Sequence, residues 1–138
     1  MNPTAPTPIS CVLALLTSLA SGANAFAGDS LDGVWDTPLG VVRVEKVGDE
    51  YVGTLEDSNP GCGFAKGSAV MRGRLAHELF TAEFKVCYPA RCKRDDAWLL
   101  GLAIPFDNGD RLAGTIAPAD PGCPNSIFKA QPFLLSRQ

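Results

Sequence analysis

Residues 78–87 read ELFTAEFKVC, and this stretch decides the fold. From Phe80 to Val86 every second residue is apolar, and the residues between them are polar. A period of two is typical of a β-strand that buries one face. Helical spacing is hard to find after residue 28, so the sequence predicts an all-β domain.

Seven other short runs, bounded by turn residues, have the composition of strands. The eight predicted strands cover residues 32–37, 41–47, 51–56, 68–75, 78–87, 97–104, 111–116 and 127–135. Proline lacks the N–H group that a sheet interior requires. Pro132 therefore predicts that the last strand lies at an edge or contains a bulge.

The sixth predicted strand is apolar on both faces. One face carries its large side chains, which are Trp98, Leu100, Leu102 and Ile104. The other face carries the alternate residues from Leu99 to Ala103, which are apolar as well. This pattern predicts a strand that is covered on both sides.

The connections between the predicted strands are of two kinds. The tight ones are residues 48–50, 76–77 and 105–110, and the long ones are 57–67, 88–96 and 117–126. In an up-and-down meander the connections alternate between two ends, so all the long loops gather at one end. Eight short strands in this order favour a small closed antiparallel barrel, which leaves no exposed edge. A β-sandwich is the alternative.

An internal repeat indicates two similar halves within one sheet. Residues 48–62, GDEYVGTLEDSNPGC, align without a gap with residues 109–123, GDRLAGTIAPADPGC. Each segment reads as a turn, a strand and a Pro-Gly-Cys loop. Chance reuse of common turn residues is the alternative explanation, and two copies are too few for a solenoid or a propeller.

The N-terminus predicts export. Residues 11–20, CVLALLTSLA, form an uncharged apolar run, and two overlapping A-x-A patterns that end at Ala25 and Ala27 follow it. This arrangement is typical of a secretory signal peptide and is too short for a membrane span. A hydrophobic anchor is the alternative, because no Lys or Arg precedes the run. We expect removal of residues 1–27, a single β domain over 28–138, and a periplasmic or secreted location.

Four cysteines follow the predicted cleavage sites, at Cys62, Cys87, Cys92 and Cys123. An even number in a short exported chain predicts two disulfides, because a zinc site needs closely paired ligands. Three connectivities are open. Cys62–Cys87 with Cys92–Cys123 would tie neighbouring loops of a meander and is preferred, whereas Cys62–Cys123 with Cys87–Cys92 would join the repeat halves.

Charge and residue types argue against several functions. A net charge of −3 gives no electrostatic footprint for nucleic acid or an anionic membrane. His77, the only histidine, lies in a predicted tight turn away from the long loops, where a catalytic base has no nucleophile to activate. Asp57, Asn59 and Asp120 are interpreted as turn formers rather than calcium ligands. We expect no enzymatic activity, no metal and no cofactor.

The loop after the fifth predicted strand is the candidate contact site. Its candidate binding residues are Tyr88, Arg91, Lys93, Arg94 and Trp98. Tyrosine and arginine are common binding hot spots, and a disulfide would lower the ordering cost of binding by stiffening the loop. A solvated loop, in which Asp95 and Asp96 offset the cations, is the alternative.

The opening of the first strand, Leu31-Asp32-Gly33-Val34-Trp35, resembles the Gly-x-Trp start of lipocalins and related calycin barrels. It also resembles several families of small secreted bacterial proteins of unknown function. In lipocalins this tryptophan closes the base of the barrel, so the resemblance implies the same place for Trp35. A barrel of this length can instead be filled by its own side chains.

Two functions of different classes follow as hypotheses. The first is an exported binding protein that carries a small apolar ligand inside the barrel. The second is a protein-binding module, such as an inhibitor of an exported hydrolase, that acts through the disulfide-tied loops. A structural role in the envelope is a third. An interior packed solid by Met71, Phe80, Phe84 and Leu100 would overturn the first.

Overall fold

The structure is a computed structural model, and it describes residues 30–90, 95–118 and 130–138. The predicted signal peptide and both Cys92 and Cys123 lie outside these ranges. The described strands are β1 (Gly33–Thr37), β2 (Gly40–Val47), β3 (Glu50–Leu55), β4 (Ala69–Ala76), β5 (Leu79–Cys87), β6 (Asp96–Phe106), β7 (Arg111–Ile116) and β8 (Gln131–Arg137). One turn of 3-10 helix, η1 (Asp107–Gly109), joins β6 to β7.

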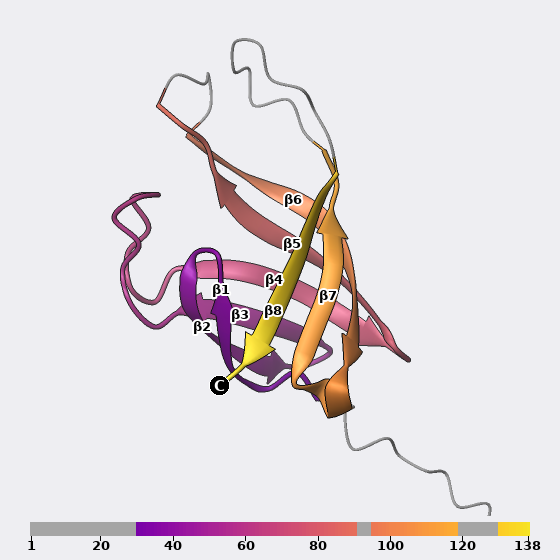
Figure 1. Cartoon of the computed structure of the whole chain (residues 1–138). Coiled ribbons are helices and arrows are strands. Elements are labelled where there is room, and N and C mark those ends of the chain that lie inside the picture. The colour runs from indigo at the N-terminus through magenta and orange to yellow at the C-terminus, as the bar shows by residue number, and fades with distance from the viewer. Residues whose placement is uncertain (1–29, 91–94, 119–129) are drawn as a thin grey trace, which may run out of the picture.

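The eight strands form a closed barrel in chain order (Figure 1). Each strand pairs antiparallel with the next, and β8 returns to pair antiparallel with β1. The predicted up-and-down barrel is therefore confirmed, and the sandwich alternative is wrong.

The barrel is closed by a short contact between its first and last strands. Trp35 pairs with Arg137, and Asp36 pairs with Ser136. The eighth strand was predicted over 127–135, but it runs on to Arg137 because these last residues make the closure.

Pro132 lies in β8 outside this closing contact, where β8 is paired with β7 alone. The amide of Arg137 donates to Asp110 of the β7 side, whereas that of Gln138 donates to Val34 of β1. The backbone N–H groups of alternate residues in a strand point to opposite neighbouring strands. The nitrogen of Pro132 therefore faces the β1 side, where β8 has no paired strand at this position, so no hydrogen bond between strands is lost. The predicted edge position is confirmed.

Pro105 was expected to start the turn after the sixth strand, and this boundary is wrong. β6 continues to Phe106, and Pro105 pairs with Leu112 of β7. The carbonyl of Leu100 accepts from Ala117 on the β7 side, so the nitrogens of odd-numbered residues face β5. Because β5 begins at Leu79, it does not extend beside Pro105, and the missing N–H breaks no ladder bond.

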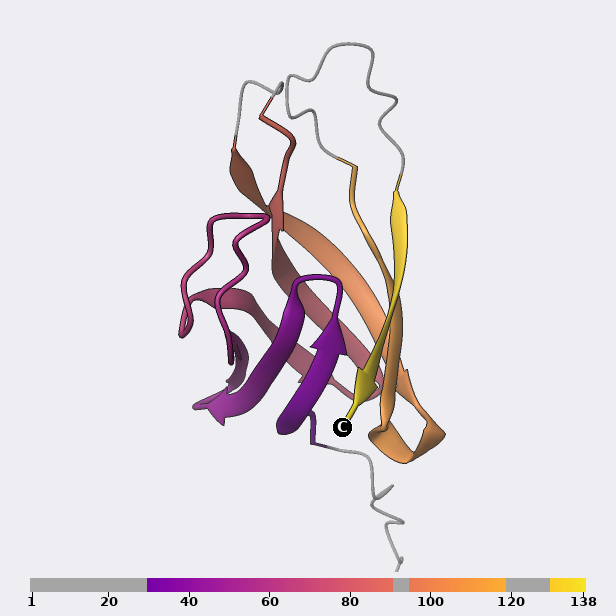
Figure 2. The ribbon, with the colours of Figure 1, turned by 60° about the vertical axis from the view of Figure 1, so that its left-hand side comes forward.

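Turn lengths separate the two ends of the barrel as expected. The tight β2–β3, β4–β5 and β6–β7 connections share one end, and the long β3–β4 loop lies at the other end with the two-residue β1–β2 turn (Figure 2). His77 lies in the β4–β5 turn with a φ of 55°. It is thus a turn residue at the end opposite the long loops.

The core fills the barrel toward its tight-turn end. The inward face of β5 is the predicted one, and Phe80 is completely buried. Tyr51 and Phe80 meet edge to face with ring centroids 6.3 Å apart, and Phe80 meets Phe84 in the same way at 6.4 Å. This arrangement suits the quadrupoles of aromatic rings, and the series runs along the inside of the barrel.

The faces of β6 are not both covered, which corrects the prediction. Gly101 and Ala103 are buried, whereas Leu102 is 44% and Ile104 55% exposed. The core therefore takes the face with small residues, because the aromatic rings on neighbouring strands need that space. Leu100 is exposed too, so it packs no part of the interior.

These exposed residues belong to an apolar outer face that spans the three strands β6, β7 and β8. Ile104 pairs with Ala113, which in turn pairs with Leu134. Leu102 pairs with Thr115, which pairs with Pro132. Neither row contains a charged side chain between β6 and β8.

The internal repeat has a structural basis in its glycines. Gly48 and Gly109 occupy matching turns before β3 and β7, with φ of 64° and 84°. Gly53 and Gly114 then occupy matching positions inside these strands, where a Cβ atom would lie 2.9 Å from Val42 or 2.7 Å from Phe133. Glycine is required in the turns by conformation and in the strands by close packing.

Candidate functional site

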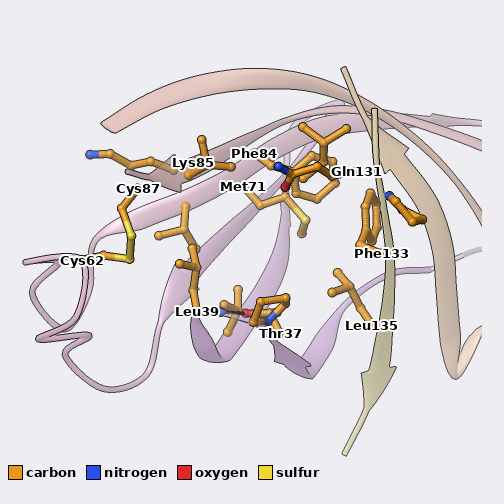
Figure 3. A pocket seen from close by; sticks show the side chains of 16 residues that line it. Thr37, Leu39, Cys62, Met71, Phe84, Lys85, Cys87, Gln131, Phe133 and Leu135 are labelled. Atoms are coloured by element: carbon orange, nitrogen blue, oxygen red, sulfur yellow. Dashed lines mark hydrogen bonds between the residues drawn. A yellow bond between two sulfur atoms is a disulfide. The ribbon is translucent and has the colours of Figure 1, made fainter. Parts of the chain in front are cut away.

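A cavity of about 320 Å³ lies inside the barrel toward the long-loop end (Figure 3). Its apolar lining residues are Pro38, Leu39, Val42, Cys62, Val70, Met71, Phe84, Val86, Cys87, Ile116, Pro132, Phe133 and Leu135. Three polar residues complete the lining, namely Thr37, Lys85 and Gln131. The interior is therefore packed solid at one end and hollow at the other.

The cavity follows from the way the barrel closes. β1 ends at Thr37 and pairs with β8 below that residue, so the two strands separate toward the long loops. Leu39 from the β1–β2 turn lines the cavity on one side, and Phe133 from β8 lines it on the other (Figure 3). Phe133 packs on Phe84 with a ring-centroid distance of 4.9 Å, which ends the aromatic series at the cavity.

A disulfide forms part of the cavity wall. Cys62, in the β3–β4 loop, is bonded to Cys87 at the end of β5, with their Cα atoms 5.4 Å apart. This bond confirms the first half of the preferred connectivity. The second predicted bond, Cys92–Cys123, lies outside the described residues and stays a prediction.

Asn59 ties the β3–β4 loop to the β1–β2 turn. Its side-chain amide donates to the carbonyl of Leu39 over 2.8 Å, and its Oδ1 accepts from the amide of Cys62 over 3.0 Å. Its backbone pairs with Phe64 in both directions. Asn59 therefore joins two segments of the cavity wall, a role that its sequence position beside Pro60 did not indicate.

Lys85 lies at the rim with its charge already paired. Its Nζ is 3.2 Å from Oδ2 of Asp96 and 4.7 Å from the centre of the Phe64 ring. Figure 3 shows its side chain running away from the other lining side chains. The ammonium group is thus paired with Asp96 and lies over the Phe64 ring, while the aliphatic part of Lys85 contributes to the lining.

The two other polar lining residues differ in their free bonding capacity. The Thr37 hydroxyl donates to the carbonyl of Gly40 over 2.8 Å and accepts from the amide of Leu39 over 3.1 Å, so it serves the turn. Gln131 begins β8, is exposed, and places its amide among the side chains that ring the cavity (Figure 3). An amide of this kind offers both a donor and an acceptor.

The predicted contact loop is only partly described. Tyr88 follows β5, and its backbone amide donates to the carbonyl of Asp95 over 2.9 Å. Trp98 lies on the outer face of β6, under the guanidinium of Arg72 at 4.8 Å from the ring centre. Neither residue lines the cavity. The remaining candidates, Arg91, Lys93 and Arg94, lie outside the described residues.

Trp35 lies below the cavity, toward the tight-turn end. It is 2% exposed, and its Nε1 donates to the carbonyl of Leu31 over 2.9 Å. The Arg137 guanidinium stacks on its ring at 5.1 Å and donates to the carbonyl of Ser30 over 2.7 Å. Residues 30–31 are thereby fixed across this end of the barrel.

Asp32 is part of the same closure. Its carboxylate accepts hydrogen bonds from the Ser30 hydroxyl and from the backbone amide of Lys46, the latter over 2.6 Å. The Ser30 bond is the main cause of a pKa below the usual value for aspartate. Burial acts against this lowering, while the Lys46 bond and the charges of Lys46 and Arg137 reinforce it.

The described part of the chain contains no group of three His, Cys, Asp or Glu side chains that could hold a metal ion. Within the same ranges, no helix has the length and apolar character needed to cross a membrane.

Comparisons with known proteins find no match for this chain. No protein-family model matches it, and no curated protein and no solved structure does so. The resemblance of residues 31–35 to the lipocalin opening therefore stays a prediction. The class that the structure itself defines is an eight-stranded antiparallel barrel with an apolar cavity at its long-loop end.

Proposed function

We propose that this protein is an exported, non-enzymatic carrier that binds a small apolar ligand in the barrel cavity. The observation that carries the proposal is the cavity of about 320 Å³ with thirteen apolar residues among its sixteen lining residues. Ligand sites are mostly apolar clefts of about 300–1,000 Å³ with few polar groups. The cavity is at the lower end of this range, which favours a small ligand.

The surroundings of the cavity support binding without large rearrangement. The Cys62–Cys87 bond and the Asn59 hydrogen bonds hold the loops that form its wall. A wall held in place before binding lowers the ordering cost of association. Removing an apolar ligand from water then supplies the favourable free energy.

Export is supported by two independent features. The N-terminal sequence has an apolar run followed by A-x-A patterns, and the barrel contains a disulfide. Disulfides form and persist in oxidising compartments such as the periplasm and the extracellular space.

Calorimetric titration with naphthalene tests the proposal. Naphthalene is apolar and has ten carbon atoms, which suits a cavity of this volume. We expect saturable binding by the wild type and loss of binding in Ile116→Trp, because Ile116 lines the cavity and tryptophan would fill it. Ile104→Trp is the matched control on the exposed outer face and should bind as the wild type does.

Two results would contradict the carrier function. The first is a folded wild type that shows no saturable binding of naphthalene. The second is an Ile116→Trp variant that binds it as tightly as the Ile104→Trp control. The alternative roles, a protein-binding module acting through the disulfide-tied loops and a structural envelope role, stay predictions.

A further inference from the structure

The polar groups around the cavity restrict the chemistry of its ligand. Of the three polar lining residues, Thr37 uses its hydroxyl both to donate and to accept within the β1–β2 turn. Lys85 has Asp96 as counter-ion and directs its ammonium away from the cavity. The lining therefore presents neither a spare threonine hydroxyl nor an uncompensated cation to a ligand.

Gln131 differs from these two residues. Its side chain lies at the exposed start of β8 and lines the same cavity as Met71 and Phe84 (Figure 3). A primary amide pairs well with a neutral hydroxyl, carbonyl or amide, since it both donates and accepts. A ligand carboxylate at this rim would gain no counter-ion, because Asp96 already compensates the charge of Lys85, so any hydration that the carboxylate gives up is not offset.

The volume sets the size of the ligand. A water-sized group occupies about 30 Å³, so a cavity of about 320 Å³ holds about ten non-hydrogen atoms. An apolar cavity of about 150 Å³ already binds benzene. The present cavity is about twice as large and accommodates a bicyclic molecule or a medium-length chain.

We infer that the ligand is an uncharged molecule of about ten non-hydrogen atoms, with an apolar body in the cavity and one polar group bonded to Gln131. This inference rests on the proposed carrier function and specifies its ligand class. The apolar body contacts the Leu39, Ile116 and Phe133 walls, and the polar group lies at the rim beside solvent.

The test compares two ligands of equal size and different charge. Nonan-1-ol and octanoate each have ten non-hydrogen atoms, and octanoate is ionised at pH 7.5. We expect nonan-1-ol to bind the wild type at least tenfold more tightly in calorimetric titrations. Equal or tighter binding of octanoate would overturn the inference, while the carrier function would stand.

Two variants test the role of Gln131. Gln131→Leu should weaken nonan-1-ol binding by about threefold to tenfold, the usual worth of one hydrogen bond, and should leave naphthalene binding intact. Gln138→Leu is the matched control, because the Gln138 amide donates to Asp36 over 2.8 Å away from the cavity. Unchanged nonan-1-ol binding in Gln131→Leu would overturn the assignment of Gln131. If the wild type binds none of the three ligands, the carrier function itself is overturned.

Discussion

Asp32 couples the charge state of the protein to the closure of its tight-turn end. Hydrogen bonds from Ser30 and Lys46 favour its ionised form and lower its pKa in the folded state. A carboxyl group whose pKa is lower in the folded than in the unfolded chain stabilises the fold above the unfolded value, which is about 3.9 for aspartate. This stabilisation is lost as the pH falls through the folded pKa.

Asp32→Asn should therefore lower the free energy of unfolding at pH 7, and its difference from the wild type should shrink below about pH 4. Urea unfolding at pH 7 and at successively lower pH measures this difference. Asp49→Asn removes the same charge from the β2–β3 turn and serves as the control. A difference for Asp32→Asn that does not change with pH would contradict the assignment.

Gly114 is a residue where the absence of a side chain determines the packing. A Cβ atom there would lie 2.7 Å from both Ala103 Cβ and Phe133 Cζ and would also meet the carbonyl of Leu102. Because part of this clash is with backbone, the neighbours have little freedom to move away. Overpacking of this kind typically costs about 1–3 kcal/mol.

We accordingly expect Gly114→Ala to lower the free energy of unfolding by about 1–3 kcal/mol. Thr115→Ala, at the next residue on the exposed face, should change it by less than about 0.5 kcal/mol. Denaturant unfolding of both variants measures the contrast. Equal small effects would show that the inside of β7 has room for a methyl group.

Among the elements, β6 shows how an apolar strand is oriented by its neighbours. Its outer face carries the larger residues and its inner face the smaller ones, since Phe84 and Phe133 occupy the space above Gly101 and Gly114. A Leu→Ala substitution should therefore have very different effects on the two sides of the wall. Leu102 on β6 is 44% exposed, whereas Leu112 on β7 is 2% exposed.

Leu112→Ala should cost about 2–5 kcal/mol of unfolding free energy, the range for a buried leucine. Leu102→Ala should cost less than about 1 kcal/mol, because much of its side chain already contacts water. Thermal and urea unfolding measure both values. A cost for Leu102→Ala close to that of Leu112→Ala would contradict the orientation of β6.

The element order was predictable from sequence because strand period and turn residues are local signals. All eight strands and the meander were predicted, since alternation such as that of β5 needs no tertiary information. The orientation of β6 was not predictable from hydrophobicity, because both faces are apolar. Gly101, inside a strand, was the available signal, since a glycine there commonly marks a close approach.

The candidate site was less predictable than the strands. The sequence predicted that function gathers at the long-loop end, and the cavity lies toward that end. Its lining comes from six strands and two connections, so it depends on how far β1 and β8 separate, which is a property of the whole barrel. Gln131 and Asn59 gave no local signal for this reason.

At the scale of the molecule, the Cys62–Cys87 bond joins the β3–β4 loop to β5. It links residues 25 apart in sequence. Closing a loop of that size raises the free energy of the unfolded chain by about 3 kcal/mol, because it lowers the entropy of that chain. Replacing Cys62 and Cys87 together by serine should lower the free energy of unfolding by about that amount. Guanidinium unfolding measures the loss, and an unchanged midpoint would contradict a stabilising role.

Native mass spectrometry of the protein recovered from its own host tests the central claim most directly. The carrier account predicts a mass above that of the bare chain, with an excess that is lost on denaturation and corresponds to a neutral molecule of about ten non-hydrogen atoms. The Ile116→Trp variant, recovered in the same way, should show no excess, whereas Ile104→Trp should retain it. A wild-type protein that consistently appears as the bare chain, or an excess that persists in Ile116→Trp, would contradict the claim that the barrel cavity holds a ligand.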